Sequence, residues 1–513
     1  MNKGGLKMDY SLTIWSVASF VETSVKDKMD YKDLEKIVGF SYRHIREVFK
    51  ESTGISLAKY MLIRRISNTA FEIVHTKESL TEIAANYHFS SYDSFTRAFK
   101  RITGMMPSRF RKQSCKVGRR RLFMGMYAPV IYRDEEYFMI SQPILEVTDK
   151  MKSVEKNNGT CILYGVPKVA YTYEECTPFP TVLKACLNYM GQTTDYAYIM
   201  AATGAAFRLR WNLNYWDGGN VDIMNVYNEP YKAFEKGFAA AGRSYKILTR
   251  DQGDKASFIQ LITSEIDQGS PVIALGIIGP PEACVITGYQ DNGHKILGWN
   301  CFQDNMEFNK GVTYHQCGYF ICDNWWENKE TIALMAIGEQ QVEKTGIKEM
   351  VKNAIQIMTN KKITHIDPLT KNIRNELAGG QDAYDAWANA ISHEQEFPQN
   401  AILPMLIERL MCQNDAQVMI AEGRSYAACF TEYIGKCHPN LAEKCHHVAD
   451  LFRKEAKCAM DMDVIKGGFE QHEEASKRFA DSEVRKKIVT LIQQAKAYDL
   501  QARQGLEEIL EML

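Results

Sequence analysis

The sequence predicts a multidomain protein with an all-α head of two helix-turn-helix units, an α+β middle domain and a C-terminal helical bundle. Three observations support this division. At 513 residues the chain is too long for one hydrophobic core, and ~100–200 residues per domain gives about three domains. A helical motif occurs twice near the N-terminus. Beyond about residue 160 the pattern becomes β-rich, and beyond residue 340 it is helical almost throughout.

Charge is distributed unevenly along the chain. The formal net charge is −1, but residues 1–121 hold 23 Lys and Arg against 12 Asp and Glu. The head therefore carries +11 and the remaining residues −12. A basic head on an acidic body indicates that only the head binds a polyanion.

The cysteines and the apolar segments of the sequence indicate the cellular compartment of the protein. Thirteen cysteines without framework spacing favour a reducing environment, and we expect free thiols. The apolar residues 12–21 are interrupted by Ser16 and Ser19 and lack a cleavage site, so we expect an amphipathic helix there and no signal peptide. No run approaches the ~18 apolar residues that span a bilayer. These features predict a cytoplasmic protein.

The head contains an internal repeat. The first copy reads Phe40-Ser41, Ile45, Val48-Phe49-Lys50 and Thr53-Gly54, and the second reads Phe89-Ser90, Phe95, Ala98-Phe99-Lys100 and Thr103-Gly104. Each copy predicts a short helix, a turn and a longer helix, over residues 33–38 and 41–52 and over residues 80–87 and 91–102.

Local signals agree with these helices. Ser79-Leu80-Thr81-Glu82 has the pattern of a capping box. Ser41 and Ser91 are expected N-caps, while Gly54 and Gly104 stand where a left-handed residue would close each longer helix.

A continuous helix is predicted between the copies, because residues 57–75 contain no Gly or Pro. At ~1.5 Å per residue it spans about 30 Å, close to the ~34 Å between successive major-groove turns of B-DNA. One chain therefore has the dimensions to place two helices in adjacent grooves.

Outward-facing side chains provide candidate DNA contacts. Arg43 and Arg46 share one face of the first longer helix, and Arg side chains form bidentate contacts with guanine worth ~1–3 kcal/mol each. In the second copy Tyr92, Asp93, Thr96 and Arg97 remain outward. Phosphate contacts are expected from Lys50, Arg64, Arg65, Lys100, Arg101 and Arg111.

The head resembles the AraC/XylS-type DNA-binding domain, most specifically over residues 89–100, Thr103-Gly104, Pro107 and Phe110-Arg111. The resemblance implies base contacts from Arg43 and Arg46 in the first unit and from Tyr92, Asp93 and Arg97 in the second. An Asp at position 93 departs from the family pattern, and its negative charge would repel phosphate. The expected DNA-binding residues are Tyr42, Arg43, Arg46, Lys50, Ser91, Tyr92, Arg97, Lys100 and Arg101. The family usually places this domain last, whereas here it comes first.

The predicted domains are a head at 8–112, a linker at 113–159, a middle domain at 160–338 and a helical domain at 340–513. In the middle domain we expect a helix at 181–190 and strands at 271–278, 283–289, 294–299 and 318–321. In the last domain we expect helices at 347–358, 401–411, 416–433, 440–457 and 484–510.

The middle domain resembles papain-like cysteine peptidases and the related butirosin-type acyltransferases. In those folds a Cys begins a helix and a His opens a strand ending in Gly-Tyr, since the chemistry needs a thiolate paired with an imidazole. Residues 282–289 reproduce the strand with Glu282 in place of the His, Thr177-Pro178 stand near the nucleophile position, and Asn300 matches the third, orienting position. We therefore expect a degenerate domain with no catalytic residues and no cofactor.

Two other kinds of site were considered. Cys176 or Cys186 with His294 or His315 would form an alternative catalytic pair, but a free Cys is usually a small buried hydrophobe. The segments Cys437-His438 and Cys445-His446-His447 match no common zinc spacing and lie in predicted helix, so no metal is expected.

A domain with the shape of an enzyme but without its catalytic residues can still bind a ligand in its cleft. Aromatic walls with a few polar anchors typically line ligand pockets, and the expected set is Trp211, Trp216, Asp222, Glu282, Trp299 and Asn300. Asp222 and Glu282 favour a cationic small-molecule effector. The leading hypothesis is a ligand-responsive transcription regulator that binds double-stranded DNA. A homodimer is compatible with this function, but DNA binding does not require one. The rivals are an active cysteine acyltransferase or peptidase fused to a DNA-binding head, and a nucleoid-type protein without sequence preference.

Overall fold

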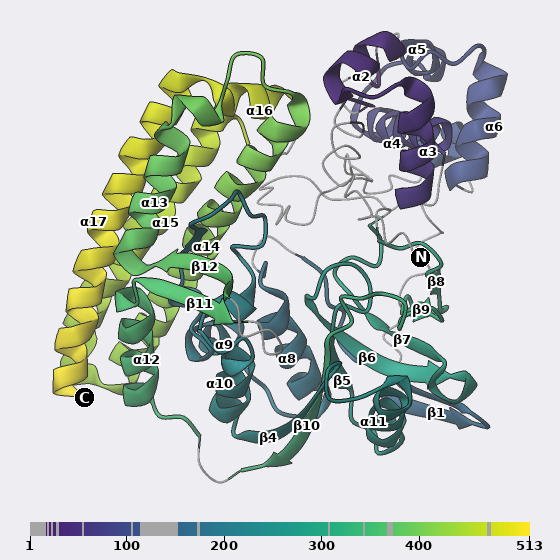
Figure 1. Cartoon of the computed structure of the whole chain (residues 1–513). Coiled ribbons are helices and arrows are strands. Elements are labelled where there is room, and N and C mark those ends of the chain that lie inside the picture. Colours follow the sequence, from purple (N-terminus) through teal and green to yellow (C-terminus); the bar gives the residue numbers. More distant parts are fainter. Residues whose placement is uncertain are drawn as a thin grey trace, which may run out of the picture.

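The computed structural model describes residues 17, 20–21, 24–26, 30–53, 56–103, 106–112, 152–171, 175–305, 308–341, 344–366, 373–468 and 473–513. It has a small helical head, a middle region built on a sheet, and long C-terminal helices (Figure 1). The expected first helix and linker fall mostly outside the described residues, as do Gly54 and Gly104. No described helix is both long and apolar enough to cross a membrane.

The head consists of short helices around one long helix, as the repeat predicts. Its helices are α2 (Tyr31–Val38), α3 (Tyr42–Thr53), α4 (Leu57–His75), α5 (Leu80–Asn86), α6 (Tyr92–Thr103) and α7 (Pro107–Lys112). The apolar faces of both repeat copies are buried, with Ile45 and Phe49 in one cluster and Phe95 and Phe99 in another. The head therefore contains two small cores joined by α4.

The predicted N-terminal caps of the head helices are confirmed. Ser79 accepts a hydrogen bond from the Glu82 backbone N–H at 3.1 Å, and the Glu82 carboxylate accepts one from the Ser79 N–H at 3.0 Å. Ser41 and Ser91 accept from the backbone N–H groups of His44 and Ser94, at 3.4 and 3.1 Å. These bonds occupy amide groups that would otherwise lack partners at the helix starts.

The middle region is organised around a nine-stranded antiparallel sheet with the order β4-β10-β5-β6-β7-β9-β8 and with the β1–β2 hairpin attached to β6. Its strands are β1 (Ser153–Asn157), β2 (Thr160–Tyr164), β4 (Arg243–Thr249), β5 (Val272–Leu275), β6 (Ala283–Gln290), β7 (Lys295–Trp299), β8 (Thr313–Tyr314), β9 (Phe320–Cys322) and β10 (Ala333–Gln340). The four strands predicted from sequence correspond to β5, β6, β7 and β9. β1 begins within the segment expected to be linker.

Three helices pack against this sheet: α8 (Pro178–Tyr189), α10 (Lys232–Ala241) and α11 (Lys255–Asp267). Two others, α9 (Tyr196–Thr203) and α12 (Ile347–Thr359), pack mainly against neighbouring helices. The short 3-10 turns are η1 (Ala205–Phe207), η2 (Ile223–Asn225) and η3 (Asp291–Gly293). α8 starts at Pro178, three residues before the predicted start, because a proline is well tolerated in the first turn of a helix.

A second sheet interrupts the region beyond residue 340, which is helical almost throughout as expected. β11 (Lys362–Ile366) and β12 (Ile373–Gly379) form a hairpin, and β12 pairs with β3 (Arg210–Asn212) of the middle region. The pairing joins residues about 165 positions apart in sequence, with Leu377 opposite Asn212. Such a long-range contact leaves no local signal in the sequence.

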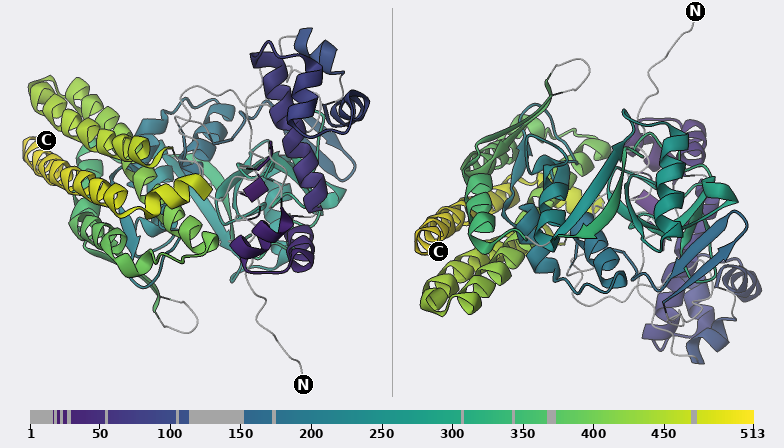
Figure 2. Two further views of the ribbon diagram at one scale, coloured as in Figure 1. Left: turned by 90° about the horizontal axis from the view of Figure 1, so that it is seen from above. Right: turned by 90° about the horizontal axis from the view of Figure 1, so that it is seen from below.

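The C-terminal helices form a bundle (Figure 2). They are α13 (Gly380–Ser392), α14 (Leu403–Cys437), α15 (Ala442–Lys466), α16 (Glu473–Ala480) and α17 (Ser482–Met512), with η4 (Glu394–Glu396) and η5 (Pro439–Leu441) between them. The two helices predicted at 401–411 and 416–433 are one continuous helix, α14. Phe430, Phe452 and Leu506 belong to the same apolar cluster as the middle sheet, so bundle and middle region share a core.

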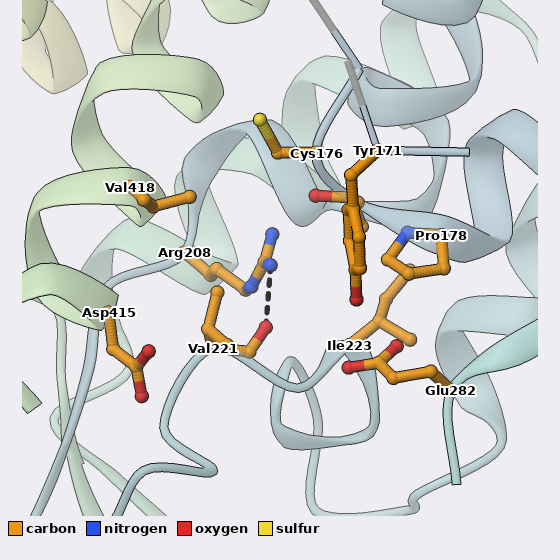
Figure 3. A pocket seen from close by; sticks show the side chains of 10 residues that line it. Tyr171, Cys176, Pro178, Arg208, Val221, Ile223, Glu282, Asp415 and Val418 are labelled. Carbon is orange, nitrogen blue, oxygen red and sulfur yellow. Dashed lines mark hydrogen bonds between the residues drawn. The ribbon is translucent and has the colours of Figure 1, made fainter. Parts of the chain in front are cut away.

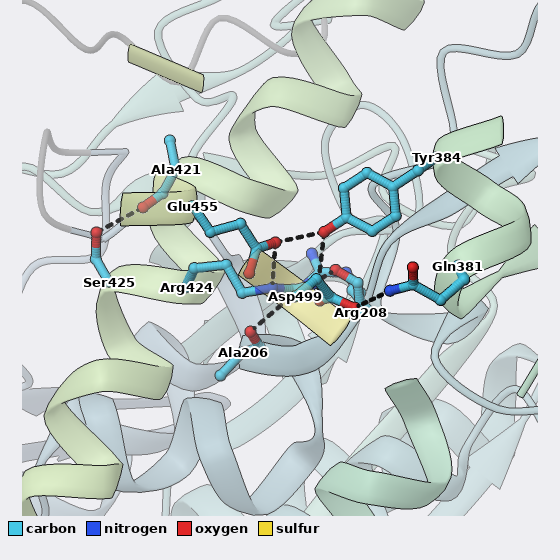
Figure 4. Close-up of polar contacts among 9 residues, drawn as sticks. All are labelled: Ala206, Arg208, Gln381, Tyr384, Ala421, Arg424, Ser425, Glu455 and Asp499. Carbon is cyan, nitrogen blue, oxygen red and sulfur yellow. Dashed lines mark hydrogen bonds and ion pairs between the residues drawn. The ribbon is translucent and has the colours of Figure 1, made fainter. Parts of the chain in front are cut away.

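A buried polar network also joins these two parts (Figure 4). Arg424 of α14 forms ion pairs with Glu455 at 2.8 Å and with Asp499 at 2.9 Å, and it donates to the backbone oxygens of Ala206 and Arg208. Both carboxylate residues are fully buried. Because the guanidinium bonds to three helices and to the segment after α9, it fixes the bundle against the middle region.

Candidate functional site

The candidate DNA-binding side chains lie on the exposed faces of α3 and α6. Arg43 is 89% exposed and pairs with Glu47 at 3.1 Å, while the Arg46 guanidinium lies 5.8 Å from the centre of the half-buried Tyr42 ring. Tyr42 itself stacks on Tyr31, with ring centres 4.2 Å apart. The residues Lys50, Ser91, Tyr92, Arg97, Lys100 and Arg101 are all exposed.

Two residues expected to contact phosphate face inward, which corrects the sequence expectation. Arg64 is 1% exposed. Arg111 donates to the backbone oxygens of Ile73 and Glu78, each at 2.8 Å, and so ties α7 to α4 and to the start of α5. Helical periodicity does not reveal that a long basic side chain folds back over its own domain.

The head contacts the bundle through its non-recognition face. Leu403, Ile407 and Met411 of α14 are buried in one apolar cluster with Leu34 and Val38 of α2. These three α14 residues follow one another at intervals of four and so lie on one face of the helix. The head is thus docked with most of its candidate DNA-binding side chains exposed, whereas the half-buried Tyr42 packs against the same cluster.

An open cleft with a volume of about 740 Å³ lies between the middle region and α14. Trp216 and Asp222, both expected ligand residues, line it together with Asp217, Glu330 and Glu408. Asp222 accepts a hydrogen bond from the Met224 backbone N–H at 2.8 Å, and burial raises its pKa to about 6. The volume falls within the ~300–1,000 Å³ typical of ligand pockets.

A narrow chamber adjoins the cleft (Figure 3), with room for the centre of a water-sized group over about 20 Å³. Val221 and Ile223 line the chamber, while Asp222 between them lines the cleft. Glu282 lines the chamber from the start of β6, and Asp415 lines it from α14. The sequence did not single out Asp415, because nothing local distinguishes it from a solvated residue of an amphipathic helix.

The chamber has an excess of acid. Burial raises the pKa of Glu282 to about 8, with a further upward contribution from the Asp222 charge. Burial also raises the pKa of Asp415 well above its usual range, and the charges of Asp217 and Glu282 add to the shift. Arg208 is the only Lys or Arg among the described residues that line the chamber.

The other expected ligand residues lie elsewhere. Trp211 stacks on Trp387, with ring centres 6.3 Å apart, and lines a second open pocket of about 620 Å³ to which Trp216 also contributes. Trp299 is buried and donates its indole N–H to the Val166 backbone oxygen at 3.1 Å. Asn300 is buried and accepts from the Phe302 N–H at 2.7 Å. The structure therefore brings Trp216, Asp222 and Glu282 around the cleft and chamber but places Trp299 and Asn300 in the core.

The segment before α8 is held by a carboxylate of α14. Glu422 accepts hydrogen bonds from the backbone N–H of Cys176 at 2.6 Å, the Thr177 hydroxyl at 2.7 Å and the Tyr196 hydroxyl at 2.6 Å. Thr177 makes no side-chain cap of its own, so Glu422 supplies the acceptor at this helix start. Cys176 lies in a small apolar cluster with Val418.

Two residues from the alternative Cys–His pairs, Cys186 and His315, have known surroundings. Cys186 is fully buried, and burial strongly raises the pKa of its thiol. His315 contacts Cys317 at 3.0 Å, a neighbour that the sequence reasoning did not consider. The described residues contain no cluster of three or more metal-ligating side chains, and their cysteines form no disulfide.

Known proteins resemble the head. Residues 34–113 match the helix-turn-helix domain family. An uncharacterized HTH-type transcriptional regulator of Bacillus subtilis, YbfP, is 29% identical over 104 residues, which are 20% of this chain and 35% of that protein. The transposon Tn10 TetD protein of Escherichia coli is 33% identical over 103 residues, which are 20% of this chain and 75% of that protein.

A solved structure is also similar to part of the chain. It is a Chromobacterium violaceum transcriptional regulator described as AraC-type, 24% identical, with a TM-score of 0.20 and coverage of 21% of this chain and 95% of its own. The chain spans about a third of the Bacillus relative, whereas it covers three quarters of TetD. Through its head the chain therefore belongs to the helix-turn-helix proteins, with residues 34–113 as the matching domain.

Proposed function

We propose that this protein is a cytoplasmic, sequence-specific transcription regulator whose DNA affinity is set by a small molecule bound beside α14. One observation carries the proposal: α14 contacts the head with Leu403, Ile407 and Met411 and lines the chamber with Asp415 and Val418. The same helix therefore touches the DNA-reading part and the ligand site.

DNA recognition follows from the placement of α3 and α6. Arg43 and Arg46 of α3 read one half-site, and Tyr92 and Arg97 of α6 read the next, because the 19 residues of α4 separate the two units. Lys50, Ser91, Lys100 and Arg101 contact phosphates, which set orientation but not sequence. Two reading units on one chain bind two half-sites, so DNA recognition does not require a dimer.

Regulation needs a ligand that binds one arrangement of the head better than another, since only differential affinity shifts an equilibrium. A ligand beside Asp415 lies one helical turn from Met411, which packs in the head's cluster. Any shift or stiffening of α14 in this stretch reaches the docked face of α2 directly.

The middle region fits a degenerate relative of the papain-like cysteine peptidases better than a working enzyme. Glu282 stands where such enzymes place the imidazole, and a carboxyl with a pKa of about 8 does not form the cation that stabilises a thiolate. The Glu422 carboxylate at the start of α8 also opposes a negative charge on the neighbouring Cys176.

The test is selection of bound DNA from a random pool by the full-length protein, repeated with Arg46→Ala and Arg97→Ala. We expect two short motifs about one helical turn apart, one of them blurred by each substitution at a cost of ~1–3 kcal/mol. Arg109→Ala is the matched control, because Arg109 is an exposed cation of the head outside α3 and α6. It should leave both motifs intact.

Two results would contradict the proposal. A pool without any preferred motif would identify a protein that binds only phosphate, as the nucleoid-type reading predicts. Turnover of thioester or peptide substrates that is lost in Cys176→Ala would establish the enzyme reading and exclude a degenerate domain.

A further inference from the structure

The chamber beside the cleft contains a buried carboxylate without a partner. Asp415 is 1% exposed, and neither of its carboxylate oxygens accepts a hydrogen bond from the described residues. Glu282 is 7% exposed and faces the same chamber. In Figure 3 the two carboxyl groups lie on either side of Arg208 and Val221. An unsatisfied buried carboxylate is costly, so natural structures keep one mainly where something else binds.

Arg208 does not satisfy these acids. Its Nη1 donates to the Ala205 backbone oxygen at 2.8 Å and its Nη2 donates to the Val221 backbone oxygen at 2.7 Å. Its single positive charge faces the carboxyl groups of Glu422, Glu282 and Asp222 together. The carboxyl groups around the chamber therefore outnumber its cation, and a bound cation would restore the balance.

The size and lining of the chamber restrict the cation. Its free volume of about 20 Å³ admits one group the size of a water molecule. Val221, Ile223 and Val418 form apolar walls, and Tyr171 adds an aromatic ring. A small organic cation with an apolar part matches this lining.

We propose that the chamber takes the ammonium group of a small primary amine, which donates hydrogen bonds to the Asp415 carboxylate while its alkyl part contacts the apolar walls. An ammonium group has three donors and the size of a water molecule, as the unsatisfied oxygens and the free volume require. This inference rests on the proposed function only in taking the amine to be the effector. A cation beside Asp415 favours the charged carboxylate, so binding opposes the rise in pKa that burial causes and releases protons.

The experiment measures thermal melting of the full-length protein with methylammonium and putrescine as probes. Tetramethylammonium and sodium chloride at equal ionic strength are the comparison salts. We expect both primary amines to raise the melting temperature at pH 7 and the comparison salts not to, because tetramethylammonium is too large for the chamber. Calorimetric titrations in two buffers of different ionisation enthalpy should show proton release.

Variants test whether the rise in melting temperature depends on residues of the chamber. Asp415→Asn should weaken amine binding at least tenfold. Glu432→Gln is the matched control, because Glu432 also lies on α14 but pairs with Arg453 and His446 outside the chamber. Without amine, Asp415→Asn should melt above the wild type at pH 9, whereas loss of a carboxylate with a purely structural role would lower the melting temperature.

Several results of these experiments would contradict amine binding in the chamber. Equal stabilisation by tetramethylammonium, or by the amines in Asp415→Asn, would overturn the inference, and so would no response of the wild type to either amine. Repeating the DNA selection with saturating amine separates the two proposals. Amine binding without any change in DNA affinity would leave the inference standing and remove the regulatory role of the chamber.

Discussion

At the scale of single residues, the most informative side chain is Glu282. Its carboxyl keeps a proton up to about pH 8 in the folded protein, whereas the unfolded chain loses that proton near the ordinary value of 4.5. The folded state therefore binds more protons between these values, so its stability falls as pH rises from about 5 to 8. Asp222 and Glu455 have raised pKa values and act in the same direction.

The variant Glu282→Gln tests how much Glu282 contributes to the pH dependence of stability. We expect the melting temperature of the variant to fall less steeply than that of the wild type between pH 5 and 8, because the amide does not ionise. Melting curves of both proteins across this range provide the measurement. Parallel pH profiles would show that Glu282 ionises as an exposed carboxyl does.

At the scale of elements, α14 contacts the head and also lines the chamber. Ile407 is fully buried between α14 and the head, whereas Ile402 just before the helix is 54% exposed. Ile407→Ala should weaken docking by ~2–5 kcal/mol, the usual cost of truncating a buried Ile, while Ile402→Ala should stay within about 0.5 kcal/mol. Hydrogen exchange of α2 should therefore accelerate in the first variant and not in the second.

The same pair of variants tests regulation through α14. We expect Ile407→Ala to change the DNA affinity of the full-length protein in the absence of any ligand, because it alters the restraint on the head. If hydrogen exchange of α2 were faster in Ile407→Ala but the DNA affinity were unchanged, docking of the head and DNA binding would be independent.

At the scale of the whole molecule, the Arg424 network predicts that bundle and middle region unfold together. Arg424→Met leaves Glu455 and Asp499 buried without their cation, which typically costs ~3–5 kcal/mol. Arg453→Met is the control, since Arg453 forms two exposed ion pairs worth ~0–1 kcal/mol. Urea unfolding followed by tryptophan fluorescence and by circular dichroism should give one coincident transition, shifted strongly only by Arg424→Met. Two separated transitions in the wild type would contradict a shared core.

The sequence by itself determined the head, because helix caps, apolar periodicity and an internal repeat are local patterns. Helices α3 to α6 lie within one or two residues of their predicted bounds, and the Ser79 capping box forms as its spacing indicates. The sequence also identified β5, β6, β7 and β9 and singled out Glu282, Asp222 and Trp216.

Only the tertiary structure decided which distant residues meet. Contacts between segments far apart in the chain decide the pairing of β12 with β3 and the turn of Arg64 and Arg111 into the head. They also decide the burial of Trp299 and Asn300 and bring Asp415 to the chamber that Glu282 lines. Burial and charge at those meeting points come from the packing of whole elements. No local pattern of residues encodes them.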